Sequence, residues 1–279
     1  MGRRPALFGI IFGFLIVTLR PLDASAVISL PDPSDTFDGI PVSVKYDEFV
    51  SYSAKLLTLW GFSGFDAPTG TGGLDVIAYT GPGGADNDPV LGGLFTFEDP
   101  APAVSGGISS FTGIWGAGAQ ANGPVLVDDV LAYLQHQFGP TATTPVFSFD
   151  MNEGGDQGTV DLSMVAEVTI FDPATSTTLA SWSFDSLANG VFDPSAYLVV
   201  PGNITVVGAS TTVYSVDNNK GSGKADFLVF APMMDLTTYA GQGYEFHAFA
   251  HLIDLDGGFE EIFISGAFAA PQQPPPTVP

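Results

Sequence analysis

The sequence contains no cysteine, and only seven of its 279 residues are Lys or Arg. Without cysteine the chain can form neither a disulfide nor a thiol nucleophile, so its stability must come from a packed core or from bound metal. Its 30 Asp and Glu residues give a formal net charge of -23. Nucleic acids and anionic membranes attract clustered Lys and Arg, so this composition excludes both as partners.

Long apolar runs are also scarce, and the most prominent one lies at the N-terminus. Arg3 and Arg4 precede the apolar run Ala6 to Leu19, and the small residues Ala24-Ser25-Ala26 follow it. This order predicts a secretory signal peptide over residues 1–26, cleaved after Ala26. The run of about fourteen residues is short for a membrane span, which needs roughly twenty. We therefore expect an exported chain with no membrane span in its mature part.

Turn-forming and strand-forming residues dominate what remains. The chain has 34 Gly, 22 Pro and 23 Phe, and 45% of its residues are hydrophobic. The segments between the turns are rich in Val, Ile, Thr, Phe and Tyr, which favours strands. We expect strands at residues 42–46, 74–80, 94–97, 108–115, 146–150, 159–171, 177–185, 196–200, 203–208, 211–216, 225–231, 243–253 and 259–266. This predicts an all-β fold, an antiparallel and jelly-roll-like β-sandwich with one or two peripheral helices.

Three segments depart from the strand pattern. Residues 127–138 carry apolar positions at helical spacing, with Gly139-Pro140 as a stop signal, and are expected to form a helix. Residues 47–60 fit a helical face as well as a strand, so both remain open. Residues 27–39, rich in Pro and Asp, predict an extended arm outside the core. The resulting organisation is a single domain over residues 27–268 and a Pro-rich extended tail over residues 269–279.

The segment from Gly243 to Phe268 is expected to form a core hairpin with an acidic tip. Its first arm alternates, with Tyr244 and Phe246 on one face and His247 and Phe249 on the other. Asp and Gly residues at 254–258 suit a tight reversal between strands.

Two acidic turns are candidate calcium sites, because calcium prefers hard oxygen ligands. The candidate ligands are Asp150, Asn152, Asp156, Asp254, Asp256 and Glu260, with Glu261 beside the second group. Neither turn matches the full twelve-residue calcium loop. Ordinary β-turns, in which Asp and Asn side chains bond their own backbone, account for the same residues.

Several other site types fail on spacing. His247 and His251 are four residues apart, which is the spacing of two zinc ligands on a helix. On a strand they lie roughly 13 Å apart and cannot bind the same ion. The glycine-rich segments 116–121 and 221–224 lack the surroundings of nucleotide-binding loops. No Gly-x-Ser-x-Gly motif occurs, so no catalytic residue and no cofactor is assigned. Aromatic residues that could stack on sugar rings, with core packing as the alternative, are Trp60, Tyr79, Trp115, Trp182 and Tyr244.

Several separate segments resemble secreted PEP-CTERM proteins. They are YDEFVSYSAKLLTLWGFSGFDAPTGTGGLDVIAYTG (46–81), TPVFSFDMNE (144–153), FDPSAYLVVPGNITV (192–206), VDNNKGSGKADFLVFAPMMDL (216–236) and GFEEIFISGAF (258–268), followed by a Pro-rich PTVP. The resemblance implies export by a Gram-negative, exopolysaccharide-producing bacterium and a place at the cell surface or in the biofilm matrix. In that family a Glu-Pro sorting motif, an apolar helix and a basic tail are processed by an exosortase. The sequence stops at Val278-Pro279, before those features, so exosortase is a partner only of a chain that continues.

Together these observations predict a secreted, non-enzymatic surface or biofilm-matrix protein. Its expected partners are extracellular polysaccharide or other matrix proteins, with calcium as a possible ligand. The alternative is a glycan-active enzyme of the glycoside hydrolase type, which would use an Asp/Glu pair 5 to 10 Å apart in a cleft.

The acidic turns allow a direct test by thermal unfolding. A calcium site predicts a higher melting temperature in calcium than in chelator, because a ligand that binds only the folded state stabilises it. Equal melting temperatures would leave ordinary β-turns as the explanation.

Overall fold

The computed structural model describes residues 28–63, 74–80, 103–104, 109–117, 124–151, 161–200, 202–221, 224–255 and 259–267. Its strands are β1 (Thr36–Phe37), β2 (Ile40–Pro41), β3 (Val44–Tyr46), β4 (Phe49–Ser53), β5 (Leu74–Thr80), β6 (Ala103–Val104), β7 (Ser110–Trp115), β8 (Pro145–Met151), β9 (Ser163–Asp172), β10 (Thr177–Phe184), β11 (Leu198–Val199), β12 (Asn203–Val207), β13 (Val213–Asp217), β14 (Phe227–Phe230), β15 (Glu245–Ile253) and β16 (Phe259–Ala267). Its helices are α1 (Ala54–Leu59), α2 (Val127–Phe138) and the 3-10 helix η1 (Leu236–Tyr239).

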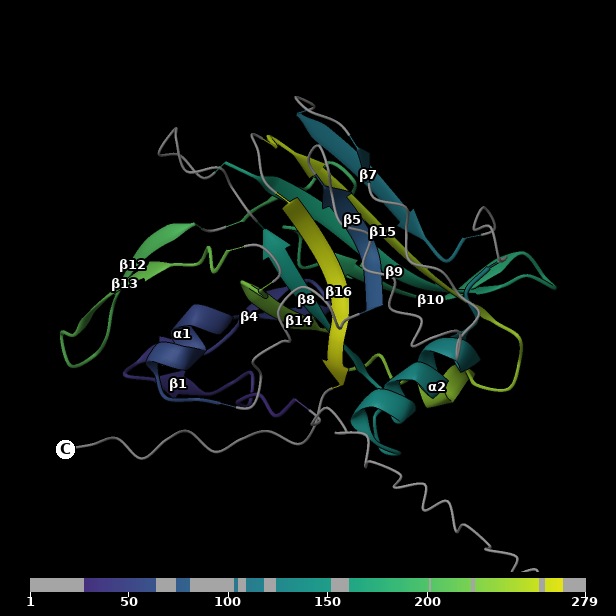
Figure 1. Ribbon diagram of the computed structural model, residues 1–279, viewed down its shortest axis with the longest axis horizontal. Coiled ribbons are helices and arrows are strands. Elements are labelled where there is room, and N and C mark those ends of the chain that lie inside the picture. Colours follow the sequence, from purple (N-terminus) through teal and green to yellow (C-terminus); the bar gives the residue numbers. More distant parts are fainter. Residues whose placement is uncertain are drawn as a thin grey trace, which may run out of the picture.

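Two stacked sheets make up the body of the fold (Figure 1), and β1 with β2 and β12 with β13 form two additional two-stranded sheets. The larger has seven strands in the order β3-β4-β14-β8-β16-β5-β6, and the smaller has the order β10-β9-β15-β7 with β11 also paired to β9. Strand pairs in both sheets are antiparallel except β5 with β6. The all-β sandwich prediction is therefore confirmed.

The two sheets differ in how they are covered. One core cluster fills the space between them, and a second packs against the outer face of the seven-stranded sheet with α1 and the N-terminal segment. All seven residues of β8 and all four of β14 are buried as a result. Along β15, by contrast, buried and half-buried residues alternate. The five-stranded sheet thus has one covered face and one open face.

Helix α2 has the predicted bounds. Asp128 and Asp129 lie in its first turn, where carboxylates favour the positive end of the helix dipole, and Gly139 caps its end at φ 102. Six of its side chains are buried, and it lies at one end of the sandwich (Figure 1). Residues 47–60, left open between strand and helix, contain both: β4 runs directly into α1, with Ser53 accepting a hydrogen bond from the Leu56 amide as the N-cap.

The predicted hairpin between Gly243 and Phe268 is wrong. β15 pairs with β7 and β9 in the five-stranded sheet, whereas β16 pairs with β5 and β8 in the other. β15 and β16 therefore belong to different sheets, and Asp254, directly after β15, has a φ of 61. Both arms present an apolar face to the shared core, so periodicity alone cannot separate a hairpin from a crossing between stacked sheets.

The N-terminal segment is not simply an arm. Ile28 and Leu30 are 4% and 0% exposed and belong to the second core cluster. The Ile28 amide also donates to the Ala267 carbonyl at 3.0 Å. Apolar side chains at alternate positions of this Pro-rich segment are enough to bury it against the sheet.

Some sequence-based predictions fall outside the described residues. These are the signal peptide at residues 1–26, the strand at 94–97 and the tail at 269–279. Within the described ranges, no helix has the length and apolar character needed to cross a membrane.

The alternation along β7 makes a testable prediction about its two faces. Trp115 is 0% exposed and packs edge-to-face on Phe246 with ring centroids 6.0 Å apart, while its neighbour Ile114 is 58% exposed. We expect Trp115→Ala to lower the free energy of unfolding by about 3–5 kcal/mol and Ile114→Ala by about 0.5 kcal/mol or less, measured by urea unfolding. Similar losses in the two variants would contradict the assignment of the faces.

Candidate functional site

The open face of the five-stranded sheet carries a row of functional side chains from three strands. Ile114 on β7 lies opposite Phe249 on β15, and Phe249 lies opposite Glu167 on β9. In the neighbouring row His247 lies opposite Thr169. Because successive strand residues point to opposite faces, these side chains share the outer face while their neighbours enter the core.

These rows line a hollow of about 260 Å³. Its lining residues are Ile114, Ala117, Glu167, Thr169, Phe192, His247, Ala248 and Phe249. Pockets for drug-sized ligands typically have volumes of about 300–1,000 Å³. The hollow is therefore suited to one ring-sized group rather than to a large ligand.

Aromatic rings form one wall of the hollow. Phe192, from the loop between β10 and β11, meets Phe249 edge-to-face, with ring centroids 5.7 Å apart and an interplanar angle of 77°. Both side chains are half-buried, so part of each ring remains accessible. Flat apolar rings of this kind complement the CH faces of sugars.

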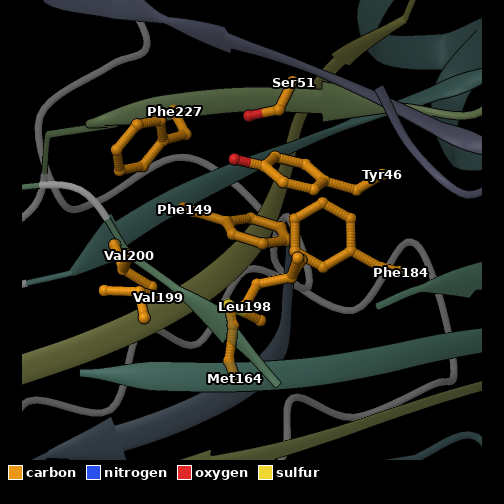
Figure 2. Close-up of a pocket in the computed structure, with 9 residues that line it drawn as sticks. All are labelled: Tyr46, Ser51, Phe149, Met164, Phe184, Leu198, Val199, Val200 and Phe227. Atoms are coloured by element: carbon orange, nitrogen blue, oxygen red, sulfur yellow. The ribbon is translucent and has the colours of Figure 1, made fainter. Parts of the chain in front are cut away.

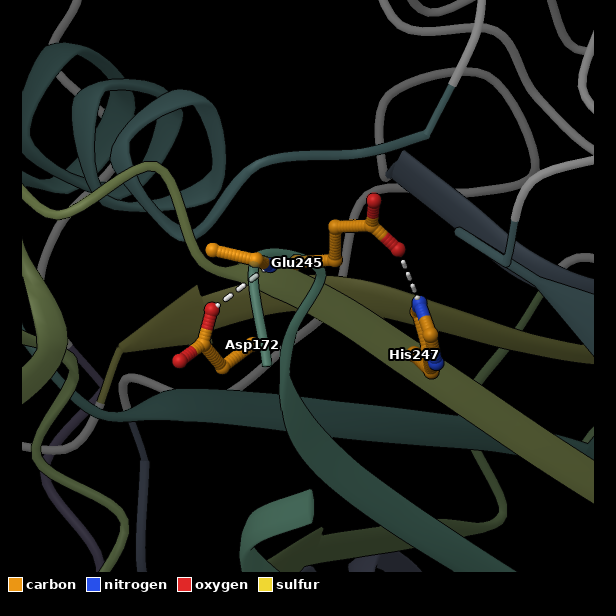
Figure 3. A network of polar contacts seen from close by, with 4 residues as sticks. Asp172, Glu245 and His247 are labelled. Atoms are coloured by element: carbon orange, nitrogen blue, oxygen red, sulfur yellow. Dashed lines mark hydrogen bonds and ion pairs between the residues drawn. The ribbon is translucent and has the colours of Figure 1, made fainter. Parts of the chain in front are cut away.

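Polar side chains in and beside the hollow are held in place. The Nε2 atom of His247 lies 2.8 Å from Oε2 of Glu245 (Figure 3), and its ring stacks on Phe171 with centroids 5.3 Å apart. Ser181 on β10 donates a hydrogen bond to Oε1 of Glu167. The orientation of the imidazole and the carboxylate is thus set before any ligand binds, which lowers the entropy cost of binding.

Glu167 and Glu245 are too far apart to act as a glycoside hydrolase pair. Glu245 pairs with Phe171 and Glu167 pairs with Phe249, which places the two Glu residues four positions apart along the strands. At about 3.3 Å per residue this is about 13 Å, whereas hydrolytic pairs are about 5 to 10 Å apart. The geometry of the hollow therefore fits binding better than hydrolysis.

Two further cavities lie between the sheets and are smaller. The larger, of about 30 Å³, is lined by side chains that include Tyr46, Phe149, Phe184 and Phe227 (Figure 2). The other has a volume of about 20 Å³. Spaces of this size hold about one water molecule, so they are features of core packing and not ligand sites.

The predicted calcium ligands are only partly described. Asp150 lies within β8 and is fully buried, Asp254 is exposed, and Glu260 on β16 is 2% exposed. Asn152, Asp156 and Asp256 lie outside the described residues. Glu260 and Glu261 are consecutive strand residues, so their side chains point to opposite faces of the sheet and cannot bind the same ion. Nowhere in the described part of the chain do three His, Asp or Glu side chains gather as a metal site would require.

Buried carboxyl groups lie instead near the end of β8. Asp150 is directly opposite Glu261 on β16, and burial raises the pKa of Glu261. Asp226, which is 1% exposed, accepts hydrogen bonds from the amides of Met151 at 2.9 Å and Lys220 at 2.6 Å. Burial raises the pKa of Asp226 to about 7, although both amide bonds and the Lys220 charge oppose the rise.

Most of the aromatic residues proposed for sugar stacking belong to the core. Trp60, Trp115 and Trp182 are 2%, 0% and 5% exposed, so these three cannot present a stacking face. Tyr244 is half-buried against the core, and the side chain of Tyr79 lies outside the described set.

Comparison with known families gives one assignment. A family model described as a domain of unknown function, DUF8239, matches residues 28–250. The chain belongs to the DUF8239 family. No curated protein and no solved structure gives a significant match to it.

All of the residues that line the hollow lie within the matched DUF8239 range. Sequence reasoning placed His247 and Phe249 on one face of a strand but did not select them. It missed Glu167 and Phe192. The alternation of residues 163–172 could have placed Glu167 on an outer face, but no local signal brings Phe192 from its loop onto Phe249.

Asp226 gives this DUF8239 domain a predicted pH dependence of stability. An unfolded carboxyl titrates near 3.8 and the folded one at about 7, so between these values the folded state keeps a proton that the unfolded state has lost. The free energy of unfolding should therefore fall as pH rises through this window, by up to about 4 kcal/mol. Urea unfolding of the wild type and Asp226→Asn at pH 5 and pH 8 covers the upper part of this window, in which the wild type should lose about 2.7 kcal/mol.

Asp226→Asn should be less stable than the wild type at pH 5, since one of the two backbone amides then faces the Asn NH₂ group. Its free energy of unfolding should change much less with pH than that of the wild type. The exposed control Asp172→Asn should keep the wild-type pH slope. The assignment to Asp226 fails if Asp226→Asn shows the same slope as the wild type.

Proposed function

We propose that the protein is a secreted, non-enzymatic component of the cell surface or biofilm matrix that binds exopolysaccharide through the outer hollow of the five-stranded sheet. The observation that carries this proposal is the hollow itself. It combines an aromatic wall, formed by Phe192 and Phe249, with the oriented polar groups Glu167 and His247 and the hydroxyl of Thr169. Sugar sites use this combination of apolar contact and fixed hydrogen-bonding groups.

Export and matrix location are proposed from the sequence. They rest on the signal-peptide pattern of residues 1–26, on the net charge of -23 and on the resemblance to PEP-CTERM proteins. Other matrix proteins are further proposed partners, and exosortase is proposed for a chain that continues with the sorting signal. Calcium at the acidic turns stays a prediction.

A glycan-active enzyme remains the second candidate, because Asp150 and Glu261 are directly opposite on neighbouring strands and burial raises the pKa of Glu261. Both residues are buried, at 0% and 9% exposure, which limits access of a substrate to them. Release of reducing ends from exopolysaccharide by the wild type, lost in Asp150→Asn and Glu261→Gln, would favour this second candidate.

Binding of exopolysaccharide should depend on the aromatic wall. We expect Phe249→Ala and Phe192→Ala each to weaken binding roughly five- to tenfold, since an aromatic contact contributes about 1 kcal/mol. Isothermal titration calorimetry with exopolysaccharide fragments measures the affinity. Met233→Ala, at a side chain 83% exposed on another part of the surface, is the matched control and should bind as the wild type does.

Phe249 is half-buried, so each variant is checked first by its melting temperature. If folded Phe249→Ala and Phe192→Ala both bind as tightly as Met233→Ala, the hollow is not the binding site.

A further inference from the structure

We infer that the hollow selects sugar units that carry a free amino group, with Glu167 as the group that recognises the ammonium. This inference rests on the proposed function and adds to it the chemical class of the bound sugar.

Glu167 is available for such a contact. Within the described structure its carboxylate has one hydrogen bond, from Ser181 to Oε1, which leaves Oε2 open to a ligand. The side chain is half-buried and lines the hollow directly opposite Phe249. A charge-assisted hydrogen bond to a half-buried carboxylate is stronger than one in open water.

No Lys or Arg side chain that could neutralise Glu167 belongs to the described lining of the hollow. After residue 26 the chain has four lysines, at 45, 55, 220 and 224. They belong to β3, α1 and the segment that precedes β14, all of which are associated with the seven-stranded sheet. The one histidine in the described lining, His247, already contacts Glu245.

This charge distribution discriminates between classes of glycan. Uronic acid units would bring a carboxylate next to Glu167 in a protein of net charge -23, and like charges repel. N-acetylated or neutral sugars could stack on the aromatic wall but would leave the Glu167 charge without a cation. An amino sugar can do both, with its ring against Phe192 and Phe249 and its ammonium on Glu167.

Lysine side chains of another protein carry the same ammonium group. The ring-sized volume of the hollow and its aromatic wall favour the amino sugar, because a lysine has a flexible stem and no flat face to stack. A lysine-rich peptide therefore serves as a separate arm of the test.

The experiment compares oligosaccharides of equal length built from glucosamine, N-acetylglucosamine or galacturonic acid, together with a tetralysine peptide, by isothermal titration calorimetry. We expect the glucosamine oligomer to bind at least about tenfold more tightly than each of the others. Glu167→Gln should remove most of this advantage, because it should weaken binding of the glucosamine oligomer far more than binding of the N-acetylglucosamine oligomer. Raising the salt concentration should weaken glucosamine binding in particular.

Two control variants separate specific recognition from general attraction of a cation to an acidic protein. Asp161→Asn removes an exposed charge six residues before Glu167, roughly 20 Å along the chain, and should leave the preference intact. Ser181→Ala keeps the Glu167 charge but removes the hydrogen bond that orients it, so it should weaken glucosamine binding less than Glu167→Gln does. If Asp161→Asn weakens glucosamine binding as much as Glu167→Gln does, the attraction is diffuse and the inference is overturned.

The remaining outcomes distinguish the inference from the proposed function. Equal binding of glucosamine and N-acetylglucosamine oligomers, unaffected by Glu167→Gln but weakened by Phe249→Ala, would overturn the amino-sugar inference and leave glycan binding in place. Tighter binding of galacturonic acid or of tetralysine would also overturn the inference. Failure of every oligosaccharide and of the exopolysaccharide itself to bind would overturn both.

Discussion

Unequal covering of the two sheets is the constraint on which the rest of this structure depends. The seven-stranded sheet packs against the five-stranded sheet on one face and against α1 and the N-terminal segment on the other. In a sheet covered on both faces, side chains on both sides of a strand are buried, as in β8 and β14, so such strands are mostly apolar in sequence. The five-stranded sheet is covered on one face only, and its strand β15 alternates accordingly.

Covering of the larger sheet brings carboxyl groups into the interior. Asp150, Asp226 and Glu261 are all less than one-tenth exposed, and burial of a charged group is unfavourable unless it is hydrogen-bonded or protonated. Asp226 shows both responses, since two backbone amides bind its oxygens and burial raises its pKa to about 7. Asp226 and Glu261 therefore link the stability of the fold to pH, whereas the Glu167 carboxylate of the open sheet remains available to a ligand.

The open sheet acquires its candidate site from segments distant in the chain. β9 and β15 supply Glu167, Thr169, His247 and Phe249, and a loop between them in sequence supplies Phe192. The aromatic wall and the carboxylate lie next to each other only because β15 is inserted between β7 and β9. The four lysines that follow residue 26 belong to segments associated with the other sheet, and this separation leaves the hollow acidic.

Local sequence was sufficient for much of the fold. The helical spacing of Val127–Phe138 and its Gly139 stop signal predicted α2 with its observed bounds, and the strand-forming composition of Leu74–Thr80 predicted β5. These features depend on residues within one turn or one strand of each other. Local sequence could not show whether the three Trp side chains pack in the core or lie on a sugar-stacking face, because that depends on residues far away in the chain.

What the sequence by itself determined is therefore the class of the fold, most of its elements and the two faces of each strand. Only the tertiary structure decided that β15 and β16 lie in different sheets, that Ile28 and Leu30 enter the core, and that the face carrying His247 and Phe249 stays open. The physical reason is that period-two alternation reports which side chains share a face. Pairing partners and covering segments are instead set by contacts between residues far apart in the chain.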